Sequence, residues 1–62
     1  MAYAEEVYDI LKTEAREMDS VYEDYITHLV GICGLRALLE ENLLESCGVI
    51  RGRQLYILVD RQ

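Results

Sequence analysis

The sequence predicts a small α+β protein that is mostly helical and ends in a β-hairpin. Apolar residues recur at steps of three and four through the first half of the chain, which is the spacing of one helix face. A second such segment follows two closely spaced glycines, and the chain then ends in a short strand, a glycine turn and an uninterrupted apolar run. A chain of 62 residues is expected to form one domain, residues 1–62.

Residues 3–31 are predicted to form one long or bent helix, because no glycine or proline interrupts the apolar stripe before Gly31. Two shorter helices are the alternative, since Ser20 and Glu23 match the two positions of a capping box. One helix of this length would measure about 43 Å at 1.5 Å per residue. The residues that follow are too few to cover such a stripe, so the long helix favours a dimer.

Gly31 and Gly34 are predicted to form a turn, because glycine weakens a helix by about 1 kcal/mol relative to alanine. The alternative is a neighbouring helix that packs closely over the two glycines. Residues 35–46 are predicted to form a second helix with leucines along one face. Gly48 is the expected left-handed residue that ends it.

Residues 49–59 are predicted to form a β-hairpin around a two-residue type II′ turn at Gly52 and Arg53. This register leaves the end of the second strand without a partner in the same chain. The strand also carries five consecutive apolar residues, so it offers apolar side chains to both faces. An unpaired apolar edge is an aggregation hazard. We therefore expect a homodimer in which these strands pair.

The expected dimer interface combines the last strand with the helix stripe. It comprises Leu55, Tyr56, Ile57, Leu58, Val59, Leu11, Met18, Tyr22 and Tyr25.

The chain is acidic, with a formal net charge of −6, and most of its acids precede the hairpin. This charge disfavours nonspecific binding to nucleic acid and to anionic membrane surfaces. A protein with a basic surface is the compatible partner. The acids are either a solvated helix face or a surface that imitates the phosphate backbone, as in small inhibitors of phage or mobile-element type. The expected partner-binding acidic face comprises Glu5, Glu6, Asp9, Glu17, Asp19, Glu23 and Asp24.

Cys33, Cys47 and His28 are the candidate metal or nucleophilic residues. A helix between the two cysteines would separate them by roughly 20 Å, whereas a disulfide needs Cα atoms within about 7 Å. We expect two small buried hydrophobes, with a bridge across a dimer as the alternative. Three soft ligands fall short of a structural zinc set. The sequence therefore predicts no metal, no cofactor, no catalytic residues and no enzymatic activity.

No apolar stretch approaches the roughly 18 residues of a membrane-spanning helix. The acidic opening of the chain does not have the pattern of a secretory signal. We therefore expect a cytoplasmic protein that has no contact with a membrane.

The part of the chain from residue 38 to residue 59 resembles the last helix and the wing of a winged-helix domain. The resemblance implies that Arg51 and Arg53 lie at the wing tip, where such domains contact phosphate. However, the preceding helix carries acidic residues where a DNA-reading helix would carry Arg, Lys, Asn or Gln.

The sequence therefore favours a small non-catalytic protein–protein interaction module. We expect it to form a homodimer that binds or inhibits a larger, basic or nucleic-acid-handling macromolecule. The alternative is a winged-helix-like DNA-binding regulator that uses Arg51 and Arg53.

Overall fold

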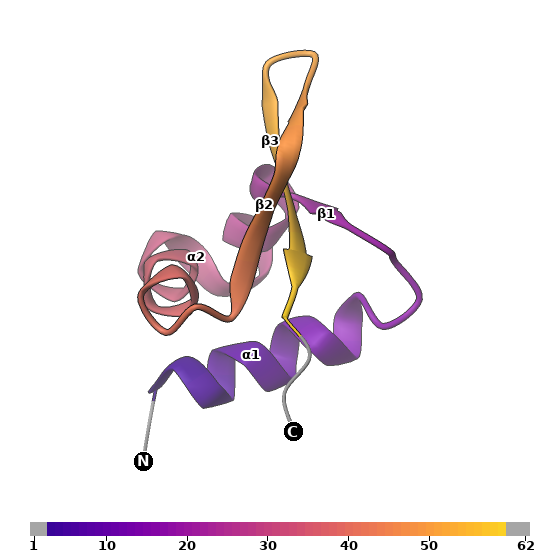
Figure 1. The fold of residues 1–62 in the computed structure, drawn as a ribbon. Coiled ribbons are helices and arrows are strands. Elements are labelled where there is room, and N and C mark those ends of the chain that lie inside the picture. Colours follow the sequence, from indigo (N-terminus) through magenta and orange to yellow (C-terminus); the bar gives the residue numbers. More distant parts are fainter. Residues whose placement is uncertain (1–2, 60–62) are drawn as a thin grey trace.

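The computed structural model describes residues 3–59 as two helices and a three-stranded antiparallel sheet (Figure 1). The elements are α1 (Tyr3–Glu14), β1 (Val21–Tyr22), α2 (Glu23–Glu40), β2 (Leu44–Ile50) and β3 (Arg53–Leu58). The order of strands in the sheet is β1-β3-β2, so the last strand is central. The predicted α+β class, with helices first and a C-terminal hairpin, is confirmed.

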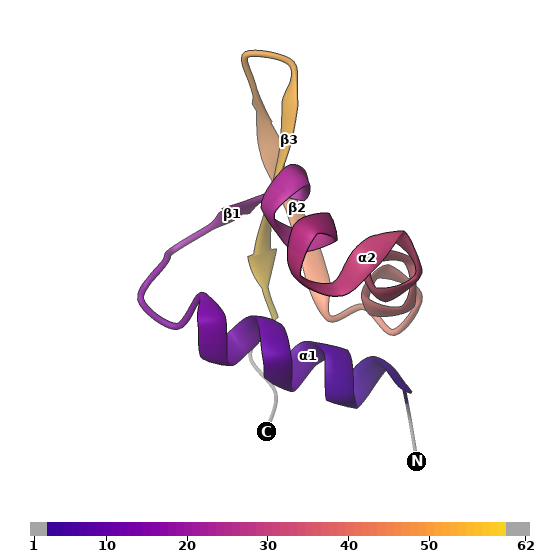
Figure 2. The ribbon, with the colours of Figure 1, turned by 180° about the vertical axis from the view of Figure 1, so that it is seen from behind.

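The predicted single helix over residues 3–31 is wrong, and the two-helix alternative describes the structure, because α1 ends at Glu14 and a second helix begins at Glu23. α1 ends at Glu14, and Val21 and Tyr22 enter the sheet opposite Tyr56 and Leu55. α2 then begins at Glu23 with Tyr22 as its N-cap, so the capping box at Ser20 does not set the start of the helix. Figure 2 shows α1 running beneath α2 and the sheet. Because the chain turns back after α1, its later elements cover the apolar side chains of α1.

α2 is broken at Gly31, whose φ of 80° and ψ of 171° lie outside the helical region. The predicted turn is therefore confirmed at Gly31, but it does not include Gly34, which is helical and buried. A Cβ placed on Gly34 would lie 2.7 Å from Val30 Cβ and 3.3 Å from Val7 Cγ1. Close packing by Val30 of the same helix and by Val7 of α1 thus explains the second glycine, and the break in α2 at a positive φ explains the first.

α2 ends at Glu40, the middle of the predicted second helix, so the prediction over 35–46 holds for residues 35–40 and is wrong for residues 41–46. Glu41 is the C-cap, and Asn42 adopts the left-handed conformation with φ 59°. The Leu43 N–H donates to the Leu38 carbonyl at 2.9 Å, and the Asn42 N–H donates to the Leu39 carbonyl at 3.1 Å. These two bonds form a Schellman motif, which releases residues 44–46 to begin β2.

The hairpin turn lies one residue earlier than predicted. Arg51 and Gly52 occupy it with φ values of 54° and 78°, which is a type I′ turn because both central residues have positive φ. Ile50 therefore pairs with Arg53. A β-bulge between Ser46 and Gly48 shifts the register once along β2.

The end of β3 is paired within the same chain. Leu58 lies opposite Leu44, Ile57 lies opposite Glu45, and the Val59 N–H donates to the Leu43 carbonyl at 2.9 Å. The prediction that these residues need a second chain for their backbone hydrogen bonds is therefore wrong. The prediction fails because α2 ends early, at Glu40, and this makes β2 long enough to pair with all of β3.

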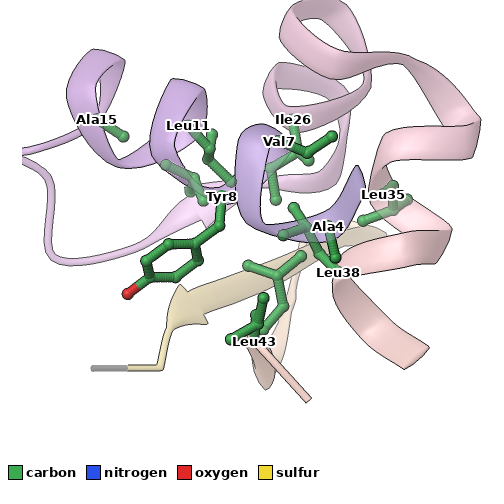
Figure 3. Close-up of a cluster of buried hydrophobic side chains, with 11 residues drawn as sticks. Ala4, Val7, Tyr8, Leu11, Ala15, Ile26, Leu35, Leu38 and Leu43 are labelled. Atoms are coloured by element: carbon green, nitrogen blue, oxygen red, sulfur yellow. The ribbon is translucent and has the colours of Figure 1, made fainter. Parts of the chain in front are cut away.

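The core lies between α1, α2 and one face of the sheet (Figure 3). Leu11, Ile26 and Leu38 are its largest fully buried side chains. The Tyr8 ring is buried beside the end of β3, and its hydroxyl donates to the Val59 carbonyl at 2.6 Å. This hydrogen bond links the residue that follows β3 to α1.

Candidate functional site

The register of the sheet separates its side chains into two faces, because cross-strand partners point to the same side and neighbours along a strand point to opposite sides. Tyr56 and Leu58 lie opposite Val21 and Leu44, which are both buried. Tyr56 and Leu58 also pack against the core. This face of the sheet is therefore the inner face, covered by the two helices.

The opposite side of the sheet carries Tyr22, Ile50, Leu55 and Ile57, and we call these four residues the outer face. Ile50 is 46% exposed, and the other three side chains are half-buried. None of the four is among the side chains that pack against the core. Within residues 3–59, the outer face is an apolar surface that the helices leave uncovered. This explains why the sequence of β3 does not alternate between apolar and polar residues.

Two charged side chains lie at opposite ends of the outer face. Arg53 precedes Leu55 by two residues on β3, and Glu45 lies opposite Ile57 at the other end of the strand pair. The outer face is therefore an apolar strip with a cation at one end and an anion at the other. Figure 1 shows the hairpin that carries it rising away from α1.

Arg53 is engaged within the chain. Its Nη2 lies 3.2 Å from Asp24 Oδ2, and its guanidinium carbon lies 4.0 Å from the centre of the Tyr22 ring. The stack and the ion pair link the hairpin to β1 and to the start of α2. Both charged side chains are exposed, so the ion pair itself adds at most about 1 kcal/mol of stability.

The nine residues predicted for the dimer interface have different surroundings in the structure. Leu11 is fully buried in the core of the single chain, and Tyr25 packs against that core together with Tyr56 and Leu58. Leu11 is thus unavailable to a second copy. The helical stripe in the sequence predicts that Met18 is buried. In the structure Met18 is 48% exposed, because α1 ends before it at Glu14.

Three members of the predicted interface, Tyr22, Leu55 and Ile57, do gather on one surface, the outer face. Val59, the remaining member, directly follows β3, and its carbonyl accepts a hydrogen bond from the Tyr8 hydroxyl. The sequence missed Ile50 as part of this surface. Ile50 lies opposite Arg53, directly beside the turn, so its place on the outer face follows from the position of the turn.

The predicted acidic face is divided between several elements. Glu5, Glu6 and Asp9 are exposed on α1, while Glu17 and Asp19 lie in the connection to β1. At the start of α2, Glu23 is half-buried and Asp24 pairs with Arg53. Acidic side chains in the first turn of a helix are stabilised by the helix dipole. Glu23 and Asp24 occupy the first turn of α2, so they have a structural role.

The predicted burial of the cysteines is wrong, since Cys33 and Cys47 are both exposed free thiols. His28 lies exposed on α2. Among residues 3–59, no three His, Cys, Asp or Glu side chains lie close enough together to hold a metal ion.

Arg51 is exposed at the hairpin tip, as the winged-helix resemblance implied. The second half of α2, residues 32–40, carries one cation, Arg36, beside the exposed side chain of Ile32. On the hairpin, Val49 is 61% exposed. Exposed apolar side chains thus lie on both elements that carry these cations.

Burial raises the pKa of the Tyr56 hydroxyl above its ordinary value of 10.0, and the nearby Glu23 carboxylate raises it further. This hydroxyl belongs to the inner face, so the shift reflects packing of the sheet against the helices.

Across the described part of the chain, neither helix combines the length and hydrophobicity needed to span a membrane. Comparison of the chain with protein-family models, with curated proteins and with solved structures finds no match.

Proposed function

We propose that this chain is a small non-catalytic protein-interaction module that binds or inhibits a larger macromolecule. The observation that carries the proposal is the outer face, where Tyr22, Ile50, Leu55 and Ile57 form an apolar strip without cover from the helices. Burial of apolar area contributes about 25 cal/mol per Å². A strip of this kind therefore favours association with another protein surface.

The charge of the chain supports a basic partner. A net charge of −6 attracts cationic surfaces and repels acidic ones, so it affects which proteins reach the outer face and how fast they bind. Exposed acids on α1, including Glu5, Glu6 and Asp9, supply part of this field. The role proposed for the acids is long-range attraction, with the apolar strip forming the contact itself.

The proposal is tested by immobilising three forms of the chain and exposing each to a lysate of the source organism. Ile57→Lys places a charge in the strip, whereas Ile10→Lys makes the same change at a 50% exposed position on α1. We expect specific proteins to be retained by the wild type and by Ile10→Lys, and to be lost from Ile57→Lys. Equal retention by all three forms, or by none, contradicts the proposal.

DNA binding is the second candidate function, because the order of the elements favours it. A helix, a short strand, a broken helix and a hairpin, with strand order β1-β3-β2, resemble the arrangement of a winged-helix domain. Arg36 and Arg51 are the exposed cations on the second half of α2 and at the hairpin tip. Since Arg53 already holds Asp24, few groups remain to neutralise phosphates.

A gel shift with duplex DNA at low salt tests this candidate. Binding that is lost in an Arg36→Ala, Arg51→Ala double variant would support it. Absence of a shift at low salt, where phosphate contacts are strongest, would remove it.

A further inference from the structure

We infer that the Asp24 carboxylate is an autoinhibitory group, which occupies the Arg53 guanidinium in place of a DNA phosphate and so weakens DNA binding by the hairpin. The inference rests on DNA binding, the second candidate function, and adds a form of regulation to it. It does not depend on which partner covers the apolar strip.

The end of the hairpin is cationic, although the chain as a whole is acidic. Residues 46–59 contain Arg51 and Arg53 and no aspartate or glutamate, whereas the formal net charge of the chain is −6. Arg51 occupies the turn, and Arg53 begins β3 two residues later. Arginines on a hairpin can neutralise phosphates of a nucleic-acid backbone. By its own sequence, the hairpin therefore has the charge of a phosphate-binding element.

The fold brings a carboxylate to this cationic segment from a distant part of the chain. Asp24 lies in the first turn of α2, and its Oδ2 atom lies 3.2 Å from Nη2 of Arg53. Carboxylate and phosphate oxygens are similar acceptors for a guanidinium, so the two groups compete for the same donors. An arginine whose charge is already neutralised adds little to the counterion release that drives DNA binding. Asp24 therefore cancels the contribution of one of the two arginines.

The Tyr22 ring holds the guanidinium in position independently of Asp24. The guanidinium carbon of Arg53 lies 4.0 Å from the centre of this ring, which is a close cation–π contact. A guanidinium has five N–H donors, and the contact with Asp24 uses one of its nitrogen atoms. When Asp24 is uncharged, the ring still presents a positioned cation to a phosphate. Asp24 therefore controls the charge of this position and not its geometry.

The ion pair has the strength of a contact that DNA can displace. The side chains of Arg53 and Asp24 are 48% and 70% exposed, so water and salt screen their attraction. A pair of this kind changes a binding equilibrium by about fivefold at most. Asp24 therefore lowers the affinity for DNA without abolishing it.

Fluorescence anisotropy with labelled duplex DNA at low salt compares Asp24→Asn with Asp9→Asn. Both substitutions remove one negative charge, and Asp9 is exposed on α1, from which the hairpin rises away (Figure 1). We expect Asp24→Asn to bind DNA about threefold to fivefold more tightly than the wild type. Asp9→Asn should change the affinity by less than about twofold, because salt screens its more distant charge.

The salt dependence of binding separates release of Arg53 from a general change in charge. In Asp24→Asn, the slope of log affinity against log salt concentration should become steeper by about 0.9, because one more phosphate is neutralised. The slope should stay unchanged in Asp9→Asn.

Arg53→Gln identifies the residue through which Asp24 acts. In this background Asp24→Asn should strengthen binding no more than Asp9→Asn does, because the cation that Asp24 occupies is absent. Circular dichroism shows whether each variant is folded. Asp24→Ser, which also removes the charge, replaces Asp24→Asn if the latter is unfolded.

Equal affinities of Asp24→Asn and Asp9→Asn, or a gain from Asp24→Asn that persists without Arg53, overturn the inference. DNA binding as a candidate function survives these results if the Arg36→Ala, Arg51→Ala double variant still loses the gel shift. Absence of binding by both the wild type and Asp24→Asn contradicts the inference and the candidate function together.

Discussion

Gly34 lies in α2 at the point where Val30 and Val7 approach its backbone. A Cβ at this position would lie 2.7 Å from Val30 Cβ, closer than two carbon atoms can approach without a shift of one of them. We expect Gly34→Ala to lower the free energy of unfolding by about 1–3 kcal/mol. Urea denaturation measures this loss.

The same crowding predicts non-additivity between neighbours. In a Val30→Ala background Val30 Cγ2, which would lie 2.8 Å from the added Cβ, is absent while Cβ at 2.7 Å remains, so Gly34→Ala should cost less than it does in the wild type but still lower the stability. Equal costs in the two backgrounds would show that the loss does not arise from contact with the Val30 methyl groups.

Tyr56 predicts how stability depends on pH in alkaline solution. Its pKa in the folded state is raised above the ordinary value of 10.0, first by burial and then by Glu23. The folded state therefore favours the neutral hydroxyl. This contribution is fully present below about pH 10 and is lost as the pH rises through the folded-state pKa.

Thermal unfolding between pH 9 and pH 11 should show this loss in the wild type and a smaller one in Tyr56→Phe. Tyr3→Phe is the matched control, because the Tyr3 side chain is 54% exposed. If Tyr56→Phe and Tyr3→Phe lose stability in parallel with the wild type, Tyr56 is not the responsible group.

At the scale of single elements, the end of α2 shows why a helix boundary is difficult to predict from the sequence. Leu35, Leu38, Leu39 and Leu43 keep a helical period past the observed end. A leucine at position 43 serves equally well as the next helical residue or as the hydrophobic contact of a Schellman motif. The sequence signal that was available is Asn42, which tolerates the left-handed conformation better than most residues.

Substitution of Asn42 tests the role of its backbone conformation. Asn42→Gly should preserve or slightly raise stability, because glycine adopts φ 59° without strain. Asn42→Val should lower the free energy of unfolding by about 1–2 kcal/mol, since its Cβ clashes in this region. Thermal unfolding distinguishes the two. A larger loss in Asn42→Gly than in Asn42→Val would show that the asparagine side chain matters more than the backbone.

The end of α1 could not be predicted from the sequence, for a different reason. Met18 and Tyr22 continue the helical stripe, and no glycine or proline marks a break after Glu14. The helix ends because Val21 and Tyr22 pair with Tyr56 and Leu55, which lie more than 30 residues away in the chain. Local periodicity carries no information about such a pairing.

The candidate site was partly visible in the sequence. The apolar run at the end of the chain predicted that both faces of the last strand would be apolar, and the register places Tyr56 inside and Leu55 and Ile57 outside. What the sequence could not supply was the number of residues in β2. That number decides whether the strand needs a second chain for its backbone hydrogen bonds, and in the structure β2 supplies them.

At the scale of the whole molecule, the small core links stability to self-association. A chain of 62 residues buries only about 60% of the surface that it exposes when unfolded, so its stability alone is marginal. In the homodimer that the sequence predicts, a second copy would bind the folded state and not the unfolded one. Association through the outer face should therefore make the melting temperature rise with protein concentration.

Each tenfold rise in concentration adds about 1.4 kcal/mol per dimer, which corresponds to an increase of roughly 3–6 °C for a domain of this size. Differential scanning calorimetry over two decades of concentration measures this slope. Ile50→Lys places a charge on the outer face at a position that is 46% exposed, so it should flatten the slope with little effect on the melting temperature of the dilute protein, whereas Ile10→Lys on α1 should leave the slope unchanged. A wild-type melting temperature that stays constant over this range would mean that the single chain is stable with its outer face uncovered.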